Sequence, residues 1–227
     1  MATSVVLEDL IEIPFLDSLA EFRSWALSDE FPERGRIDFI AGRIEVDMSP
    51  EDIFCHGTVK TEIVAVLGQL VKQGGLGYLL SDRTRVSCPG ADLSVEPDVV
   101  FLSEASLESG RVRLVPKATS QSDRYVEVEG APDLIVEIVS DSSETKDTRR
   151  LPAAYARVGV REFWLVDARG ERPVFEIRRI GAADYQSADR DSDGFQHSDV
   201  FNASFSLARN RNAHGRWTYD LQTRPNS

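Results

Sequence analysis

The chain has 227 residues, with 26 Lys and Arg against 38 Asp and Glu, and its formal net charge is −12 at pH 7. An acidic chain repels nucleic acid at long range, which argues against strong non-specific binding of DNA or RNA. A local patch completed by a bound cation remains compatible with this charge. The 41% hydrophobic and 28% charged residues are typical of a globular protein with a core of ordinary size.

Targeting signals and membrane segments are not evident in the sequence. No apolar run is long enough to cross a bilayer, and the N-terminal stretch MATSVVLEDLIEIPF has no basic segment followed by an apolar one. Cys55 and Cys88 are isolated thiols without the spacing of a metal site. These features predict a cytoplasmic protein with no membrane partner.

The first third of the chain reads as a helix, a hairpin and a second helix. Residues 17–32 predict a short helix that Asp17 or Ser18 can cap. Residues 35–50 alternate like two strands around a turn at Ala41-Gly42. Apolar residues recur at helical spacing over residues 56–73, and the glycines of QGGLG end that helix.

The middle of the chain predicts strands. YLLSDRTRVSC, residues 78–88, alternates like one strand, and PDVVFLS, residues 97–103, is a short β-rich run. Residues 104–130 are polar and irregular, and they predict a loop excursion with one or two short strands.

The last part continues with the strand DLIVEIVS at 133–140, a polar turn, a helix over Pro152–Val158 and a strand REFWLVDA at 161–168. RPVFEIRRI, residues 172–180, can pair with that strand as a hairpin, and residues 181–227 have strand-like spacing. The pattern predicts one mixed α/β domain over residues 1–227.

Several kinds of functional site are excluded by the motifs that are missing. There is no GxGxxG, no GxxxxGK[ST], no GxSxG and no HExxH. His56 is interpreted as a polar contact before a helix rather than as a catalyst, and Asp167 as a cap at the end of a strand. A zinc site is not expected.

The carboxylates remain as candidates. Glu137 lies within the apolar run LIVEIVS, where an ionised carboxylate is costly unless a cation, a metal or hydrogen bonds compensate it. Asp133 shares its strand face but lies about 13 Å away, too far to share one ion. Glu137 therefore needs a partner from another strand, and Asp98, at the start of a similar strand, is the natural candidate.

A hard divalent cation between Asp98 and Glu137 would offset the cost of burial and could activate water near a phosphodiester. Spacing alone leaves an alternative open, because a glutamate inside a strand can equally pair with an arginine.

The stretch APDLIVEIVSDSSETKDTRRLPAAYARVGVREFWLVDARG, together with GRIEVDMSP, His56 and EPDVVFLS upstream, resembles the Uma-two family of restriction endonuclease-like proteins. This family is a branch of the PD-(D/E)XK nuclease superfamily. The likeness covers roughly residues 30–180. The residues that carry it are Pro132-Asp133, Glu137, Ser140, Asp147, Tyr155, Gly159-Val160, Phe163-Trp164 and Asp167.

The resemblance implies a restriction-endonuclease-like core over residues 30–180, a mixed sheet flanked by helices, with residues 181–227 as a β-rich C-terminal extension. It implies that Asp98 and Glu137 bind Mg²⁺ (or Mn²⁺) and that DNA is the substrate.

The lysine of the superfamily pattern is displaced. The position two residues after Glu137 is Val139, and the position in the following helix where relatives carry a lysine is Leu151. Lys146, in the turn after the strand, is the favoured replacement, against the alternative of no catalytic lysine. Pro152 disfavours helical geometry at Leu151, so the helix is expected to start late. Residues 146–150 then form a mobile connection near the site.

Arg149 and Arg150 in this connection can contact phosphate, although an arginine cannot act as a base. Two functions follow: a Mg²⁺-dependent DNA endonuclease, or a catalytically inactive nuclease fold that binds nucleic acid or a protein. A homodimer would suit cleavage of both strands of a duplex.

Overall fold

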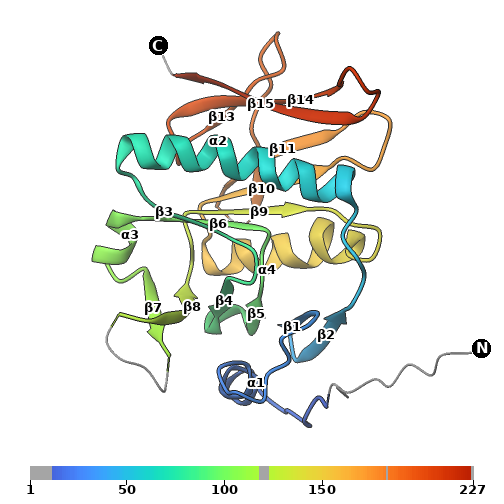
Figure 1. Cartoon of the computed structure of the whole chain (residues 1–227). Helices are drawn as coiled ribbons and strands as arrows, with labels where there is room; N and C mark the ends of the chain where they lie inside the picture. Colours follow the sequence, from blue (N-terminus) through green and yellow to red (C-terminus); the bar gives the residue numbers. More distant parts are fainter. Residues whose placement is uncertain (1–11, 118–122, 183, 226–227) are drawn as a thin grey trace, which may run out of the picture.

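We describe a computed structural model of the chain, which covers residues 12–117, 123–182 and 184–225 (Figure 1). Three sheets and a few helices make up this part of the chain. The helices are α1 (Leu19–Ala26), α2 (Thr58–Gly74), α3 (Glu104–Glu108) and α4 (Leu151–Val158), with the π-helical turns η1 (Ile53–Gly57) and η3 (Lys146–Arg150) and the 3₁₀ turn η2 (Pro89–Ala91).

The central sheet has six strands in the order β12-β11-β10-β9-β6-β3. Only the β9–β10 pair is parallel, so the sheet is mixed, as predicted. Its strands are β3 (Gly77–Ser81), β6 (Val99–Ser103), β9 (Leu134–Ile138), β10 (Glu162–Asp167), β11 (Val174–Ile180) and β12 (Tyr185–Ser187).

A second six-stranded sheet has the order β2-β1-β5-β4-β8-β7, and a three-stranded sheet has the order β13-β14-β15. The second sheet consists of β1 (Arg36–Ile40), β2 (Arg43–Asp47), β4 (Arg85–Cys88), β5 (Leu93–Val95), β7 (Val112–Pro116) and β8 (Tyr125–Gly130). The third consists of β13 (Gln196–Ser198), β14 (Ala203–Arg211) and β15 (Trp217–Pro225).

Helices cover both faces of the central sheet, as Figure 1 shows. On one face α2 lies between the central sheet and the three-stranded sheet, in a core that includes Leu134, Val136 and Trp164. On the other face α4 and the second sheet pack on a core that includes Ile135 and Val139. Alternate residues of β9 thus enter opposite cores, as the period of a strand requires. The predicted fold class, a mixed sheet flanked by helices, is confirmed.

The N-terminal predictions are confirmed in detail. Ser18 caps α1 by accepting a hydrogen bond from the backbone N–H of Glu21. The β1–β2 turn at Ala41 and Gly42 has φ of 49° and 75°, the geometry of a tight hairpin turn. Gly75, at φ 59°, ends α2 in the left-handed conformation that glycine adopts easily.

The prediction of one strand over residues 78–88 is wrong. The chain turns at Asp82 and Arg83, which have φ of 46° and 53°, so β3 joins the central sheet and β4 the second sheet. The five polar residues SDRTR at 81–85 mark this turn, and the prediction of a continuous strand passed over them. Residues 104–130 contain the two short strands β7 and β8, and in addition the helix α3, which was not predicted.

The expected non-helical connection at residues 146–150 is also wrong. These residues form η3, and Leu151 has helical φ and ψ of −64° and −47° although Pro152 follows it. Pro152 lies in the first turn of α4, where its missing N–H leaves no hydrogen bond unmade. The wider π turn before it keeps the backbone helical up to the proline.

No helix in the described part of the chain is both long and apolar enough to span a bilayer.

Candidate metal centre

Strands β6 and β9 bring Asp98 and Glu137 together. Their antiparallel register pairs Val99 with Val136, and one further step places Asp98 opposite Glu137. Opposed residues of an antiparallel pair have Cβ atoms about 4.5–5.5 Å apart. Asp98 Oδ2 also accepts a 2.8 Å hydrogen bond from the backbone N–H of Ile138. Both side chains are buried, with 1% of each residue exposed.

Asp98 is surrounded by cations. Its Oδ1 lies 3.0 Å from Arg36 Nη2 and 3.6 Å from Lys60 Nζ, and its Oδ2 lies 3.4 Å from His56 Nε2. Burial alone would raise the pKa of Asp98, but the hydrogen bond from His56 and the charge of Arg36 hold that pKa below its ordinary value. The alternative left open by the sequence was an arginine paired with Glu137, but in this structure the arginine pairs with Asp98 instead.

Glu137 is in a different environment. Among the described residues no cation lies within ion-pair distance of it, and its Oε1 accepts a 2.6 Å hydrogen bond from the hydroxyl of Tyr155 on α4. Burial raises the pKa of Glu137 well above its ordinary value, and the nearby charges of Asp147 and Asp98 raise it further. Glu137 is thus a buried acid without a cation as direct partner, and the raised pKa means that its surroundings favour the neutral form.

Lys146 points into the same region from η3. Its Nζ lies 3.0 Å from Asp38 Oδ2, and only 7% of the residue is exposed. Burial by itself would lower the pKa of Lys146, but the charges of Asp38, Asp147 and Glu137 raise it above its ordinary value. The ammonium of Lys146 therefore pairs directly with Asp38, and the expectation that Lys146 folds back over Glu137 as a catalytic residue stays a prediction.

Asp38 and Asp147 belong to the centre although they were not predicted as site residues from the sequence. Asp38 lies between Ile37 and Phe39 in the strand RIDFI, the same signal of an acid inside an apolar strand that singled out Glu137. Asp147 is 1% exposed, and burial raises its pKa to about 6. Asp147 gave no such signal, because only the helical geometry of η3 turns it inward.

Arg36 neutralises several of these acids at once. Burial would lower its pKa, but the negative charges of Asp98, Glu137 and Asp38 raise it, in that order of strength. Its guanidinium thus lies among the acids to which a cation would bind. Any metal at this centre has to compete with it.

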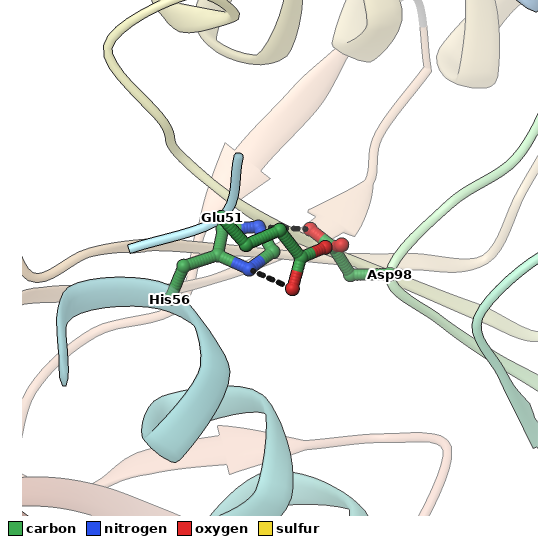
Figure 2. Close-up of side chains that lie close together, drawn as sticks. All are labelled: Glu51, His56 and Asp98. Atoms are coloured by element: carbon green, nitrogen blue, oxygen red, sulfur yellow. Dashed lines mark ion pairs between the residues drawn. The ribbon is translucent and has the colours of Figure 1, made fainter. Parts of the chain in front are cut away.

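A second set of donors lies on the other side of Asp98. The ring of His56 lies between two carboxylates, with Nδ1 3.3 Å from Glu51 Oε2 and Nε2 3.4 Å from Asp98 Oδ2 (Figure 2). One donor atom from each of Glu51, His56 and Asp98 can be chosen so that all lie within 4.8 Å of one another. The interpretation of His56 as a simple polar contact is incomplete, because the ring is 4% exposed and reaches into the centre.

Two buried atoms at the centre have no hydrogen-bond partner. They are Asp147 Oδ1 and His56 Nδ1, and in the described part of the chain only Tyr219 Oη shares this property. Buried polar groups are nearly always satisfied, so unsatisfied donors and acceptors at one place indicate a missing partner. An acid set with orphaned ligand atoms fits a divalent cation.

The other predicted residues lie around this centre. Asp133 is at the far end of β9, where it accepts hydrogen bonds from Ser103 N and Ser106 Oγ, and it takes no part in the centre. Asp167 caps its strand by accepting a hydrogen bond from the backbone N–H of Arg169, as interpreted. Arg150 forms a bidentate ion pair with Glu45. Arg149 is exposed.

The segment that follows β2 lines two hollows beside the centre. Two hollows of about 390 and 420 Å³ both include Asp47, Met48, Ser49 and Ser142 in their walls. The first extends to Arg36 and His56, and the second to Lys146 and Arg150. Asp38 reaches the wall of the second hollow, whereas Asp98, Glu137 and Asp147 line neither of the two.

Comparisons with known proteins bear on the family and the fold of the chain. A profile of the Uma2 family, described as "Putative restriction endonuclease", matches residues 19–210. A solved structure described as a "putative nuclease belonging to DUF820" from Anabaena variabilis ATCC 29413 is 19% identical to this chain, covers 81% of it and 90% of its own length, and superposes with a TM-score of 0.58. That likeness shows a shared fold. No curated protein matches the chain.

Proposed function

The chain belongs to the Uma2 family, and from this premise we propose that it is a divalent-metal-dependent endonuclease that hydrolyses DNA phosphodiester bonds. One observation carries the proposal: Asp98 and Glu137, from neighbouring strands, oppose each other in a buried acid cluster. The cationic residues around this cluster, among them Arg36 and Lys146, line two hollows at the surface. Acids arranged in this way are expensive to bury unless a cation joins them.

Asp98 and Glu137 are the residues that would hold Mg²⁺ or Mn²⁺, with the unpartnered Oδ1 of Asp147 as a further donor. Carboxylate oxygens are the ligands that these hard ions prefer. When bound, such an ion makes a water nucleophilic near neutral pH and offsets negative charge on the phosphodiester.

The remaining groups would orient the metal-binding acids and stabilise charge on the phosphate. Tyr155 fixes the Glu137 carboxylate through its hydroxyl, and Asp38 holds the Lys146 ammonium close to the acids. Because its pKa is raised, Lys146 stays protonated, and it would stabilise charge that develops on the phosphate rather than accept a proton. We assign Arg149 and Arg150 to contacts with the DNA backbone, where Arg150 would exchange its bond to Glu45 for one to phosphate.

DNA would approach through this local patch rather than through the overall field of the chain, which is negative. A homodimer would place two centres on the two strands of a duplex, and we propose it as the form that makes double-strand breaks.

The inactive alternative has specific support. Arg36 lies 3.0 Å from Asp98 where a metal would be needed, and neither lysine position of the superfamily pattern holds a lysine. In this reading the arginine permanently replaces the metal, and the fold serves as a binding module for nucleic acid or protein.

Whether DNA cleavage depends on Glu137 distinguishes the nuclease from the inactive alternative. We expect the purified chain to nick supercoiled DNA in Mg²⁺ or Mn²⁺ and not in chelator, and Glu137→Gln, which keeps the shape of the side chain, to lower the rate at least about a hundredfold. The variant Glu176→Gln, which changes a partly exposed carboxylate on β11, should cut like the wild type when purified in the same way, and so controls for a contaminating nuclease.

Cleavage by Glu137→Gln at the wild-type rate would exclude the mechanism. If no ion supports cleavage but Arg36→Met binds divalent ions that the wild type does not, the inactive alternative holds.

A further inference from the structure

The donor set of Glu51, His56 and Asp98 has a different chemistry from the Asp98–Glu137 pair. Two of its donors are carboxylate oxygens and the third is an imidazole nitrogen. Mg²⁺ is bound almost entirely by oxygen, whereas Mn²⁺, Co²⁺ and Zn²⁺ accept an imidazole readily. We infer that this set is a second cation site at the centre, sharing Asp98, and that it selects a transition-metal ion over Mg²⁺.

Local structure fixes His56 for this role. Asp52 caps η1 by accepting hydrogen bonds from the backbone N–H groups of Phe54 and Cys55, at 2.8 and 2.6 Å. The backbone N–H of His56 donates to the carbonyl of Asp52 as well. The ring is thereby held between Glu51 and Asp98 (Figure 2).

The buried nitrogen provides an observation independent of the acids. His56 Nδ1 is buried and forms no hydrogen bond, and its 3.3 Å contact with Glu51 Oε2 is an ion pair only when the ring is protonated. A buried nitrogen that makes no hydrogen bond destabilises the metal-free protein. A metal bond to the ring would remove that cost, and Glu51 Oε2 lies 3.3 Å away on the same side.

The three donors can close around one ion with a small movement. Donors on opposite sides of an ion at about 2.1 Å lie about 4.2 Å apart, and the donors here lie within 4.8 Å of one another. Glu51, whose side chain is 50% exposed, is free to make the adjustment.

Lys60 is the competitor for this site. Its ammonium lies 2.8 Å from Glu51 and 3.6 Å from Asp98, so it supplies positive charge where the ion would bind. It also lies 2.7 Å from the exposed Asp82, which can retain it when the ion enters. The site therefore gains a cation without leaving Lys60 unpaired.

Metal binding by the full chain tests the inference. We expect isothermal titration to show Mn²⁺ binding at least about tenfold tighter than Mg²⁺, and pulsed EPR of bound Mn²⁺ to show the modulation of a directly bonded ¹⁴N. Both Glu51→Gln and His56→Gln should weaken Mn²⁺ binding at least about tenfold. Only His56→Gln should remove the nitrogen signal.

Two variants make the result specific. His214→Ala, which changes an exposed histidine, should leave Mn²⁺ affinity and the nitrogen signal unchanged. Glu137→Gln should keep the nitrogen signal, because Glu137 is not part of this donor set. Glu51 is half-exposed, so Glu51→Gln remains informative even if a change at buried His56 disturbs folding.

Failure of this inference and failure of the proposed function give different results. A nitrogen signal in a chain that never cuts DNA supports the site and contradicts the nuclease. Equal affinity for Mn²⁺ and Mg²⁺, or bound Mn²⁺ without nitrogen, overturns the site even if the chain cuts DNA.

Discussion

Each acid at the centre is held in a different way, and this difference determines what each can do. Asp98 is compensated by Arg36 and accepts a backbone hydrogen bond. Glu137 is restrained only by the hydroxyl of Tyr155. Asp147 uses one oxygen for Ser143 and leaves the other without a partner. Stability alone would not select such a set, because buried like charges raise each other's free energy.

We therefore expect Asp147→Asn to stabilise the metal-free protein. Burial raises the pKa of Asp147 from 3.8 to about 6, so its ionised form is penalised by about 3 kcal/mol where the folded carboxyl is deprotonated. The asparagine oxygen can still accept the hydrogen bond of Ser143. Thermal unfolding monitored by circular dichroism in chelator should show a melting temperature several degrees above that of the wild type.

The pH dependence of this gain has a definite sign. Below about pH 4 the carboxyl is protonated in both the folded and the unfolded chain, so the variant should have no advantage. The advantage should grow as the pH rises toward 6 and stay constant above it. Addition of Mg²⁺ should stabilise the wild type more than the variant, and an advantage independent of pH would contradict the assigned cause.

Among the residues of the centre, the sequence can predict only those that stand out from their neighbours in a local pattern. Glu137 and Asp38 each interrupt an apolar strand, and a single sequence contains that signal. Arg36, His56 and Lys60 act through contacts with Asp98 that lie about forty or more positions away along the chain. Contacts between positions so distant in the chain leave no periodic pattern in the sequence. Only the fold shows that these three residues contact Asp98.

At the scale of elements, strand alternation and glycine turns were sufficient for most of the architecture. The hairpin of β1 and β2, the helix α2 and the strands β9 and β10 could all be predicted from period and turn residues. The division of residues 78–88 between two sheets could not, because the sheet that a strand joins depends on pairing with strands distant in the chain. The sequence did not predict η3. The residue before a proline usually avoids helical geometry, but after the wider π turn Leu151 adopts it.

A buried carboxylate joins the central sheet to the C-terminal strands. Glu162, on β10, accepts 2.6 Å hydrogen bonds from Trp164 Nε1 and Ser198 Oγ, and a 2.9 Å bond from the backbone N–H of Asp199. Ser198 ends β13. The Glu162 side chain therefore fixes the three-stranded sheet on the same face of the central sheet as α2.

Replacement of Glu162 by alanine should lower the stability markedly. It leaves several buried donors without an acceptor, each worth about 1–3 kcal/mol. We expect the melting temperature to fall by roughly 5 °C or more. Glu176→Ala, which removes a partly exposed carboxylate on the neighbouring β11, should change the stability by about 0.5 kcal/mol or less. Equal effects of the two variants would show that Glu162 does not anchor the sheet.

At the scale of the whole molecule, the chain folds around shared cores. Phe201, Phe205 and Leu221 from the C-terminal segment lie in the same cluster as Ile63 of α2 and Trp164 of β10. This continuity supports one domain over residues 1–227, with residues 181–227 as an extension of the core, which stays a prediction.

The net charge of −12 makes a further prediction about DNA. An acidic chain gains little from the release of counterions that drives most protein binding to DNA. If the acid centre receives a divalent cation, the ion converts the part of the surface that faces the scissile phosphate from negative to positive. DNA binding should therefore depend on a divalent ion, even where no bond is cut.

Fluorescence anisotropy of a labelled duplex in Ca²⁺, which commonly replaces Mg²⁺ at oxygen sites, would measure this. We expect the dissociation constant to fall at least about tenfold on going from chelator to Ca²⁺ at constant ionic strength. Glu137→Gln should lose most of this gain, whereas Glu176→Gln should keep it. An affinity that is the same in chelator and in Ca²⁺ would mean that the chain binds DNA, if at all, through a surface other than the acid centre.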